Sequence, residues 1–325
     1  MNVGTDNRTS TPPRGPAAPR AVALCLGAVM VLGAAALIFP RLGHYALWDD
    51  EANTALFAQG VWRTGDTTAV LDHNIVAYGS GAELSGLKNR SIPPLGYYVA
   101  APFVGLLGNT AFAARLPFAL AGLATVLVLA GWLWRDRADT LTWVLTTMGM
   151  LGNVSFMLYS QQARWYTLAI LLSVVIAYLH LHWDGRTRGV VALAVAMILL
   201  FAANYMSYLA IVACLLTDYI LRARKERRLS GRQWLALLLP QIAICGVIYY
   251  VWNPLSTMST YVRPTEALPW WDKPYDALVL AWYHLREING SEYGVGYLMV
   301  LCPLFYLATK NRWLLYAPLT LAVYV

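Results

Sequence analysis

Three consecutive carboxylates, Asp49, Asp50 and Glu51, follow the first long apolar run of the chain and are well suited to chemistry. Adjacent negative charges repel one another unless a cation is bound or a proton is shared. A carboxylate at a membrane surface can act as a general base toward a hydroxyl or an amine. It can also bind a divalent cation, with Asp72 and His73 as further ligands, but no ligand spacing here is diagnostic and we assign no metal ligands.

The same triplet is typical of a helix start. Asp49 or Asp50 would be a good N-cap, and residues 51–59 place Ala52, Ala55 and Leu56 along one face. Carboxylates in a first turn also interact favourably with the helix dipole. Capping explains one carboxylate but not three, so we expect a short interfacial helix whose first turn carries a functional site.

The amino-acid composition indicates whether these elements fold in water or in a membrane. Apolar residues make up 58% of the 325-residue chain and charged residues 13%, against roughly 45–50% and about 25% in soluble domains. We therefore expect an all-α membrane protein, a polytopic bundle of transmembrane helices. The expected spans are Ala21 to Phe39 and then 115–134, 140–158, 164–183, 189–203, 205–221, 234–252, 293–308 and 313–325.

Two terminal features allow alternatives. A cleavable signal peptide is the alternative for the first span, but its apolar run exceeds the usual length of about 7–15 residues, so we expect an uncleaved anchor. Residues 1–20 are rich in Pro, Arg, Ser and Thr, which predicts a disordered tail. The last apolar run, 313–325, is shorter than the roughly 20 residues that a span needs, so we expect further spans to be missing at the C-terminus.

The basic residues predict the orientation. The net charge of +7 could suggest nucleic acid, but most Lys and Arg residues lie in the tail and in short turns between spans. The positive-inside rule accounts for them, so we expect the tail in the cytoplasm and no nucleic-acid partner. Segment 93–107 is expected to be interfacial, because a full span there would move the basic turns outside. The outer side then carries the loop 41–92, the link 159–164 and the loop 253–292.

Four segments of the chain, taken in their order along the sequence, resemble segments of one protein family. They are Leu47-Trp-Asp-Asp-Glu-Ala, Ile92-Pro-Pro-Leu-Gly-Tyr-Tyr, Ala114-Arg-Leu-Pro-Phe-Ala-Leu-Ala-Gly and Tyr159-Ser-Gln-Gln-Ala-Arg-Trp-Tyr-Thr-Leu. The chain resembles the polyprenyl-phosphate-sugar glycosyltransferases of the protein O-mannosyltransferase type, which include the lipid A aminoarabinose transferases.

The resemblance implies a GT-C architecture, with interfacial helices and a catalytic acid in the first outer loop. It also implies inverting transfer of a sugar from a polyprenyl-phosphate carrier to a glycan, lipid or protein acceptor. The reaction would take place on the non-cytoplasmic face of the cell membrane, and a divalent cation remains open as a cofactor.

Carried over to this chain, the family's Asp-Glu pair falls on Asp50 and Glu51. Asp50 would be the catalytic base, with Asp49 as the alternative because the triplet makes the register ambiguous. The leaving phosphate would need cations, and the expected substrate-binding residues are Lys88, Arg90, Arg164, Gln162 and Tyr166.

The chain departs from the family at one point. Many members carry a basic residue directly before Pro-Pro-Leu, where this chain has Ile92 and places Arg90 two residues earlier. Arg115 is expected to be a structural anchor. The alternatives are a polytopic transporter, for which we find no repeated halves, and an inactive or fragmentary relative.

Overall fold

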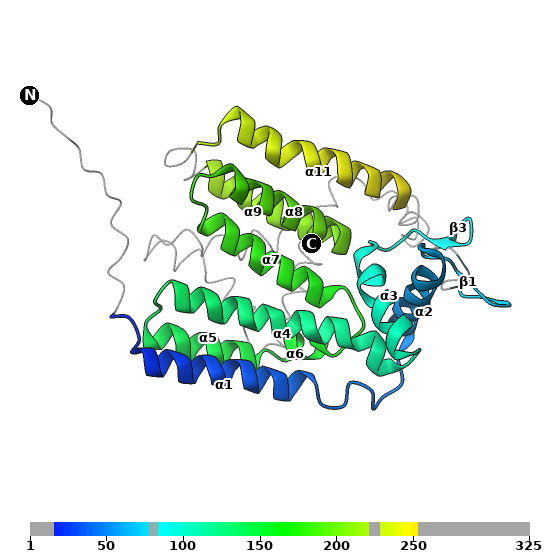
Figure 1. Ribbon diagram of the computed structural model, residues 1–325, viewed down its shortest axis with the longest axis horizontal. Coiled ribbons are helices and arrows are strands. Elements are labelled where there is room, and N and C mark those ends of the chain that lie inside the picture. Colours follow the sequence, from blue (N-terminus) through cyan, green and yellow to red (C-terminus); the bar gives the residue numbers. More distant parts are fainter. Residues whose placement is uncertain (1–15, 78–80, 82–83, 221–227, 253–325) are drawn as a thin grey trace, which may run out of the picture.

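The computed structural model describes residues 16–77, 81, 84–220 and 228–252. Most of its helices lie side by side in a bundle, and two further helices with two small hairpins lie across one end of that bundle (Figure 1). We call this the loop end. The opposite end is the basic end, where Arg135 ends one helix, Arg186 precedes another and Arg232 lies in the first turn of a third. The loop 253–292 and the last two expected spans lie outside the described residues.

The bundle helices follow the apolar stretches of the sequence. They are α1 (Arg20–Ile38), α4 (Ala111–Arg135), α5 (Thr140–Gly152), α6 (Val154–Ser160), α7 (Tyr166–Leu181), α8 (Thr187–Ala203), α9 (Tyr205–Asp218) and α11 (Gly231–Trp252). Within the described part, α1, α4 and α11 are long and apolar enough to cross a membrane, and α5 with α6 could form a fourth, bent span. These helices fit a polytopic helical membrane fold.

The expected span 140–158 is broken. Helices α5 and α6 meet at an angle of 57°, and Asn153 lies between them in an extended conformation. Its side-chain Oδ1 accepts a hydrogen bond from the Phe156 N–H at 2.6 Å. A side chain that caps a new helix competes with the continuing backbone ladder, so this residue ends one helix and begins the next.

The loop end contains strands that the all-α expectation lacked. Strand β1 (Val70–Leu71) pairs with β2 (Asn74–Ile75), and β3 (Leu84–Ser85) pairs with β4 (Lys88–Asn89), both antiparallel. Each hairpin has only two residues on each side of its turn. The expected tail also ends earlier than residue 20, because the Ala18 N–H donates to the Ala138 carbonyl at 3.1 Å.

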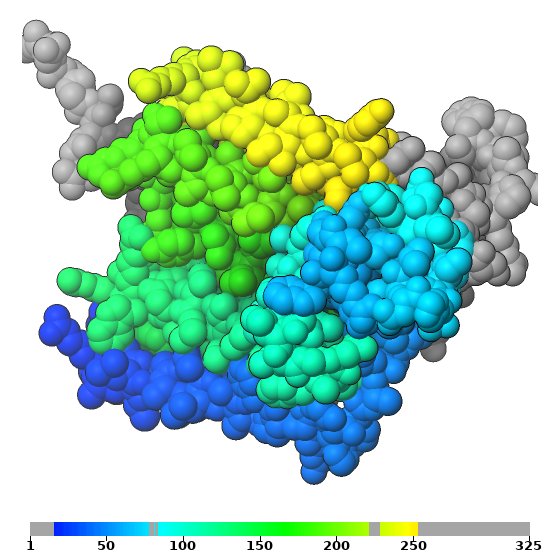
Figure 2. Space-filling view, turned by 45° about the vertical axis from the view of Figure 1, so that its right-hand side comes forward, coloured from blue at the N-terminus to red at the C-terminus, as the bar shows by residue number. Residues whose placement is uncertain are grey.

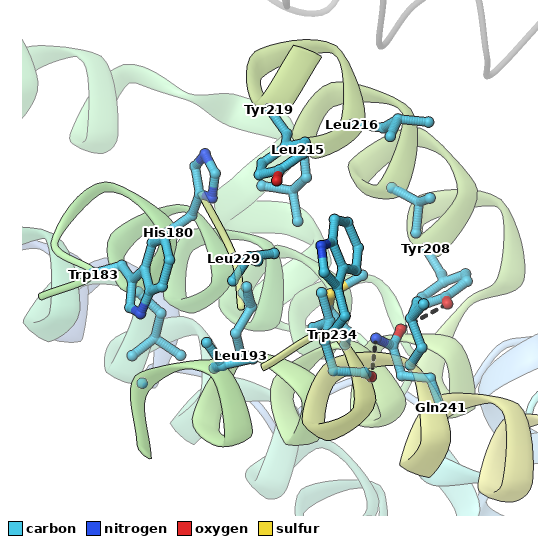
Figure 3. A pocket seen from close by; sticks show the side chains of 17 residues that line it. His180, Trp183, Leu193, Tyr208, Leu215, Leu216, Tyr219, Leu229, Trp234 and Gln241 are labelled. Atoms are coloured by element: carbon cyan, nitrogen blue, oxygen red, sulfur yellow. Dashed lines mark hydrogen bonds between the residues drawn. The ribbon is translucent and has the colours of Figure 1, made fainter. Parts of the chain in front are cut away.

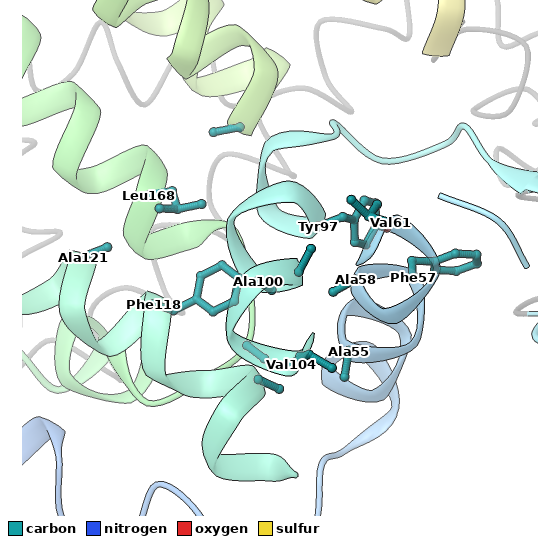
Figure 4. Close-up of a cluster of buried hydrophobic side chains, with 14 of the residues drawn as sticks. Ala55, Phe57, Ala58, Val61, Tyr97, Ala100, Val104, Phe118, Ala121 and Leu168 are labelled. Carbon is teal, nitrogen blue, oxygen red and sulfur yellow. The ribbon is translucent and has the colours of Figure 1, made fainter. Parts of the chain in front are cut away.

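The helices of the loop end pack tightly on each other. Helix α2 (Asp49–Thr64) lies against α3 (Leu95–Leu107), which falls within the segment 93–107 expected to be interfacial. Phe57, Tyr97 and Phe118 join small alanines in one core between α2, α3 and α4 (Figure 4). At Gly105 a Cβ would overlap the Trp62 indole, so glycine permits the close approach. Figure 2 shows α2, α3 and the hairpins covering the end of the bundle between α1 and α11.

Candidate functional site

The three carboxylates open α2, but none of them is the N-cap residue. Trp48 holds that position with extended backbone angles, and its N–H donates to Glu51 Oε2 at 3.4 Å. The side chain of Glu51, the third residue of the helix, therefore accepts a hydrogen bond from the N-cap backbone, which is one of the two hydrogen bonds of a capping box. Successive helical side chains point about 100° apart. Asp49 is accordingly exposed, Asp50 is half-buried and Glu51 is 1% exposed.

Glu51 forms a buried ion pair with Arg115 of α4. Arg115 Nε lies 2.8 Å from Glu51 Oε1, and Arg115 Nη2 lies 2.5 Å from Glu51 Oε2. Glu51 Oε1 also accepts a hydrogen bond from the Ala163 N–H at 2.8 Å. The remaining guanidinium donors bind three carbonyl oxygens before α2, at 2.8–3.0 Å, those of Leu42, Tyr45 and Ala46.

This ion pair joins four segments: the connection before α2, α2 itself, α4 and the turn between α6 and α7. Both carboxylate oxygens of Glu51 are engaged in it, which suits a positioning residue rather than a free base. Arg115 links these segments, which fits the role of structural anchor expected from the sequence. Gly122 on the same helix lets α4 approach the last residue of α6, because a Cβ there would overlap the Ser160 side chain.

Asp50 faces a second cation. Its Oδ2 forms an ion pair with Nη1 of Arg164, which lies in the α6–α7 turn and is 13% exposed. Arg164 Nη2 donates to the Tyr166 hydroxyl at 3.2 Å. The guanidinium carbon lies 5.2 Å from the ring centre of Tyr166 and 5.7 Å from that of Trp48. Contacts with aromatic faces stabilise the cation and limit its movement.

The Asp50–Arg164 pair borders a small hollow at the loop end. Its walls come from the first turns of α2, the residues that open α3, and the α6–α7 turn. The lining residues are Asp50, Thr54, Ile92, Pro93, Gly96, Tyr97, Arg164 and Trp165. Gln162, expected to bind substrate, is not among the lining residues; its carbonyl accepts a hydrogen bond from the Arg164 N–H at 2.9 Å. The structure thus brings Asp50 and Arg164 together, with Tyr166 beside them, and leaves Asp49 outside the hollow.

Lys88 and Arg90 share a carboxylate that the sequence analysis missed, Asp66. Arg90 binds it in a bidentate manner, Nη1 to Oδ1 at 2.8 Å and Nη2 to Oδ2 at 2.9 Å. Lys88 Nζ lies 2.7 Å from Asp66 Oδ2. Two cations on one carboxylate leave a net charge of about +1. The Arg90 hydrogen bond, with help from Lys88, holds the pKa of Asp66 well below its ordinary value despite partial burial.

Asp66 is placed by the end of α2. It directly follows Gly65, which ends α2 in the left-handed conformation with φ at 78°. Arg90 also lies over the Trp252 ring, 4.7 Å from the ring centre, so the cluster reaches the last turn of α11.

The further ligands considered for a divalent cation do not gather with the triplet. Asp72 lies in the β1–β2 hairpin and pairs with Arg63 at 2.7 Å. In the part of the chain that the structure describes, no three His, Cys, Asp or Glu side chains lie close enough to hold a metal ion. The acidic residues of the loop 253–292 lie outside the described residues.

Comparison of the chain with protein-family models, with curated proteins and with solved structures found no match. The arrangement of the site is therefore interpreted from its own chemistry. A half-buried carboxylate, a confined arginine and a separate cationic cluster lie at one end of a helical bundle. Such a set can accept a proton and stabilise a developing negative charge.

Proposed function

We propose that this protein is a GT-C type glycosyltransferase that moves a sugar from a polyprenyl-phosphate carrier to an acceptor. One observation supports this most strongly: the four segments that carry the family resemblance meet at one place. Glu51 from the first segment binds Arg115 from the third and Ala163 from the fourth. Pro93 from the second segment lines the hollow beside Asp50.

In the proposed reaction Asp50 takes the proton of the acceptor hydroxyl or amine. The acceptor atom then bonds to the anomeric carbon of the sugar as the bond from that carbon to the phosphate oxygen breaks. The electron pair leaves with the polyprenyl phosphate. Arg164 borders the same hollow as Asp50, and we assign it to the leaving phosphate.

The cluster of Lys88, Arg90 and Asp66, which lies just before α3 in the chain, would assist in binding the donor phosphate. Its excess positive charge attracts a phosphate, whereas the Asp50–Arg164 pair is neutral as a whole. Lys88 and Arg90 therefore remain substrate-binding candidates, and Asp66 is added as the residue that holds them. We place the loop end on the non-cytoplasmic side and the basic end in the cytoplasm, following the positive-inside rule.

The test uses membranes that contain the full-length protein and labelled polyprenyl-phosphate sugars, with identification of the product. Asp50→Asn should lower the rate by about 10²–10⁴-fold, the usual contribution of a general base. Asp49→Asn is the matched control and should retain wild-type transfer, because its side chain is exposed outside the hollow. Arg164→Gln should lower the rate without loss of the folded protein.

Two results would contradict the proposal. Full transfer by Asp50→Asn would remove the base assignment, even if the protein is a transferase. Ion-coupled uptake of a solute by the wild-type protein, with no glycosyl transfer from any labelled donor, would favour a transporter instead.

A further inference from the structure

A second cavity lies far from the carboxylates, in the half of the bundle near the basic end. It has a volume of about 300 Å³ and is enclosed by α7, α8, α9 and α11 (Figure 3). Leucine, valine and methionine side chains line most of it, among them Leu193, Met197, Val212, Leu215 and Leu237. A cavity of this size within membrane helices is large enough for a hydrocarbon chain.

The cavity covers the depth of about one lipid leaflet. Its lining runs from Gly189 to Met197 on α8 and from Trp234 to Gln241 on α11. At 1.5 Å per residue these segments extend about 10–12 Å along the helix axes. They begin near the basic end and stop near the middle of α11, and half of a hydrocarbon core is roughly 15 Å.

The side chains of Tyr208, Gln241 and His180 on the walls are already paired with the protein. The Tyr208 hydroxyl donates to Gln241 Oε1 at 2.8 Å, and Gln241 Nε2 donates to the Leu237 carbonyl at 2.8 Å. His180 Nε2 lies 2.7 Å from Asp218 Oδ2. A polar ligand would lose its hydrogen bonds with water on entering this cavity, whereas a hydrocarbon chain would lose none.

We call the end of the cavity nearest the basic end its mouth; aromatic side chains line it and arginines precede or open the adjoining helices. Trp183, Tyr219 and Trp234 belong to its lining near the basic end, where amphipathic rings suit the membrane interface (Figure 3). The Gln233 amide donates to the Gly185 carbonyl at 2.7 Å, which holds the start of α11 against the α7–α8 turn. Three exposed arginines flank that contact along the chain, Arg186, Arg188 and Arg232.

The arginines at the mouth outnumber their acidic partner. Asp184 contacts both Arg186 and Arg188, at 3.4 and 3.7 Å, so this group carries a net charge of about +2 once Arg232 is included. Basic groups between transmembrane helices favour anionic lipid head groups. The apolar cavity and its basic mouth thus match the two parts of one amphipathic molecule.

We propose that this cavity binds one hydrocarbon chain of an anionic membrane lipid, whose head group contacts Arg186, Arg188 and Arg232. The site lies in the leaflet opposite to the carboxylates at the loop end. It is therefore a lipid site separate from any sugar donor, and it does not depend on the proposed glycosyl transfer.

Native mass spectrometry of the full-length protein in detergent tests this proposal, with phosphatidylglycerol and phosphatidylcholine of identical chains as probes. Wild-type protein should bind phosphatidylglycerol about tenfold more tightly than phosphatidylcholine. Leu237→Trp fills the cavity and should lower phosphatidylglycerol binding about tenfold. Leu239→Trp is the matched control on the same helix, since Leu239 is 63% exposed and lies outside the lining, and it should bind as the wild type does.

Replacing Arg186, Arg188 and Arg232 together with glutamine should remove the preference for phosphatidylglycerol and leave phosphatidylcholine binding unchanged. If Leu237→Trp does not fold, Leu193→Phe fills the same cavity from α8. Equal phosphatidylglycerol binding by wild-type and folded cavity-filled proteins would overturn the proposal. So would a wild-type protein that binds neither lipid, which would indicate that another part of the chain occupies the cavity.

Discussion

At the scale of residues, the triplet shows how one turn of a helix can give three identical charges three different environments. Asp49 is exposed, Asp50 borders the hollow with Arg164, and Glu51 is buried against Arg115. The repulsion expected among three carboxylates is relieved by two arginines, Arg115 from α4 and Arg164 from the α6–α7 turn. The role of proton acceptor, considered for the whole triplet, is therefore assigned to Asp50 in the proposed function.

Glu51→Gln should destabilise the protein strongly while keeping the size of the side chain. The neutral amide would leave the Arg115 guanidinium, whose side chain is 8% exposed, without its counter-charge. Breaking a buried ion pair on one side typically costs about 3–5 kcal/mol. Thermal unfolding followed by helical circular dichroism measures this change. Asp49→Asn is the control and should stay within about 0.5 kcal/mol of the wild type; equal stability of the two variants would contradict the buried role of Glu51.

Asp66→Asn should destabilise the loop end in a pH-dependent way. The folded-state pKa of Asp66 is lowered by Arg90 and Lys88, so its ionised form contributes stability above the ordinary carboxyl pKa, near 3.9. This contribution is lost as pH falls below that value toward the lower folded-state pKa. The difference in stability between wild type and variant should therefore be constant from pH 7 to about pH 5 and shrink below pH 4.

Limited proteolysis of the loop 65–92 at each pH follows this difference directly. Asp72→Asn is the control, because Asp72 is 70% exposed and its pair with Arg63 lies at the surface. A difference that grows on acidification would contradict the assigned ion cluster.

At the scale of elements, hydropathy predicted where most helices lie, because apolar length alone defines a membrane helix. It did not predict the break at Asn153, since one polar residue in an apolar run can also face a neighbouring helix. The hairpins at 70–75 and 84–89 were missed because two-residue strands have no periodicity. The pairing of Asp66 with Arg90, 24 positions apart, depends on tertiary contacts that no local pattern records.

Gly105→Ala should weaken the packing of α2 on α3. A methyl group at that position would overlap the Trp62 ring, and overpacking a close helix contact costs about 1–3 kcal/mol. Gly131→Ala on α4 is the matched control, because a Cβ there has open space. Removing a helical glycine without a clash should be neutral or stabilise by about 0.5–1 kcal/mol. Thermal unfolding of both variants checks this, and equal effects would contradict the close approach of the two helices.

At the scale of the whole molecule, the two ends of the bundle differ in chemistry. The loop end holds ion pairs between carboxylates and cations, and the basic end carries arginines with fewer acidic partners in the described turns. Because cytoplasmic turns collect Lys and Arg, this asymmetry predicts that the two ends face opposite sides of the membrane. The proposed transfer at the loop end and the proposed lipid at the basic end would then act in different leaflets.

Single cysteines test that orientation in intact cells, in a background where Cys25, Cys214, Cys245 and Cys302 are replaced by alanine. Asp49→Cys at the loop end should react with a membrane-impermeant maleimide added outside, because this position is exposed. Arg188→Cys at the basic end should react only after the membrane is permeabilised, since its 75% exposed side chain would face the cytoplasm. Labelling of both from outside would show that the ends share one side, and labelling of Arg188→Cys alone would reverse the orientation and place Asp50 in the cytoplasm.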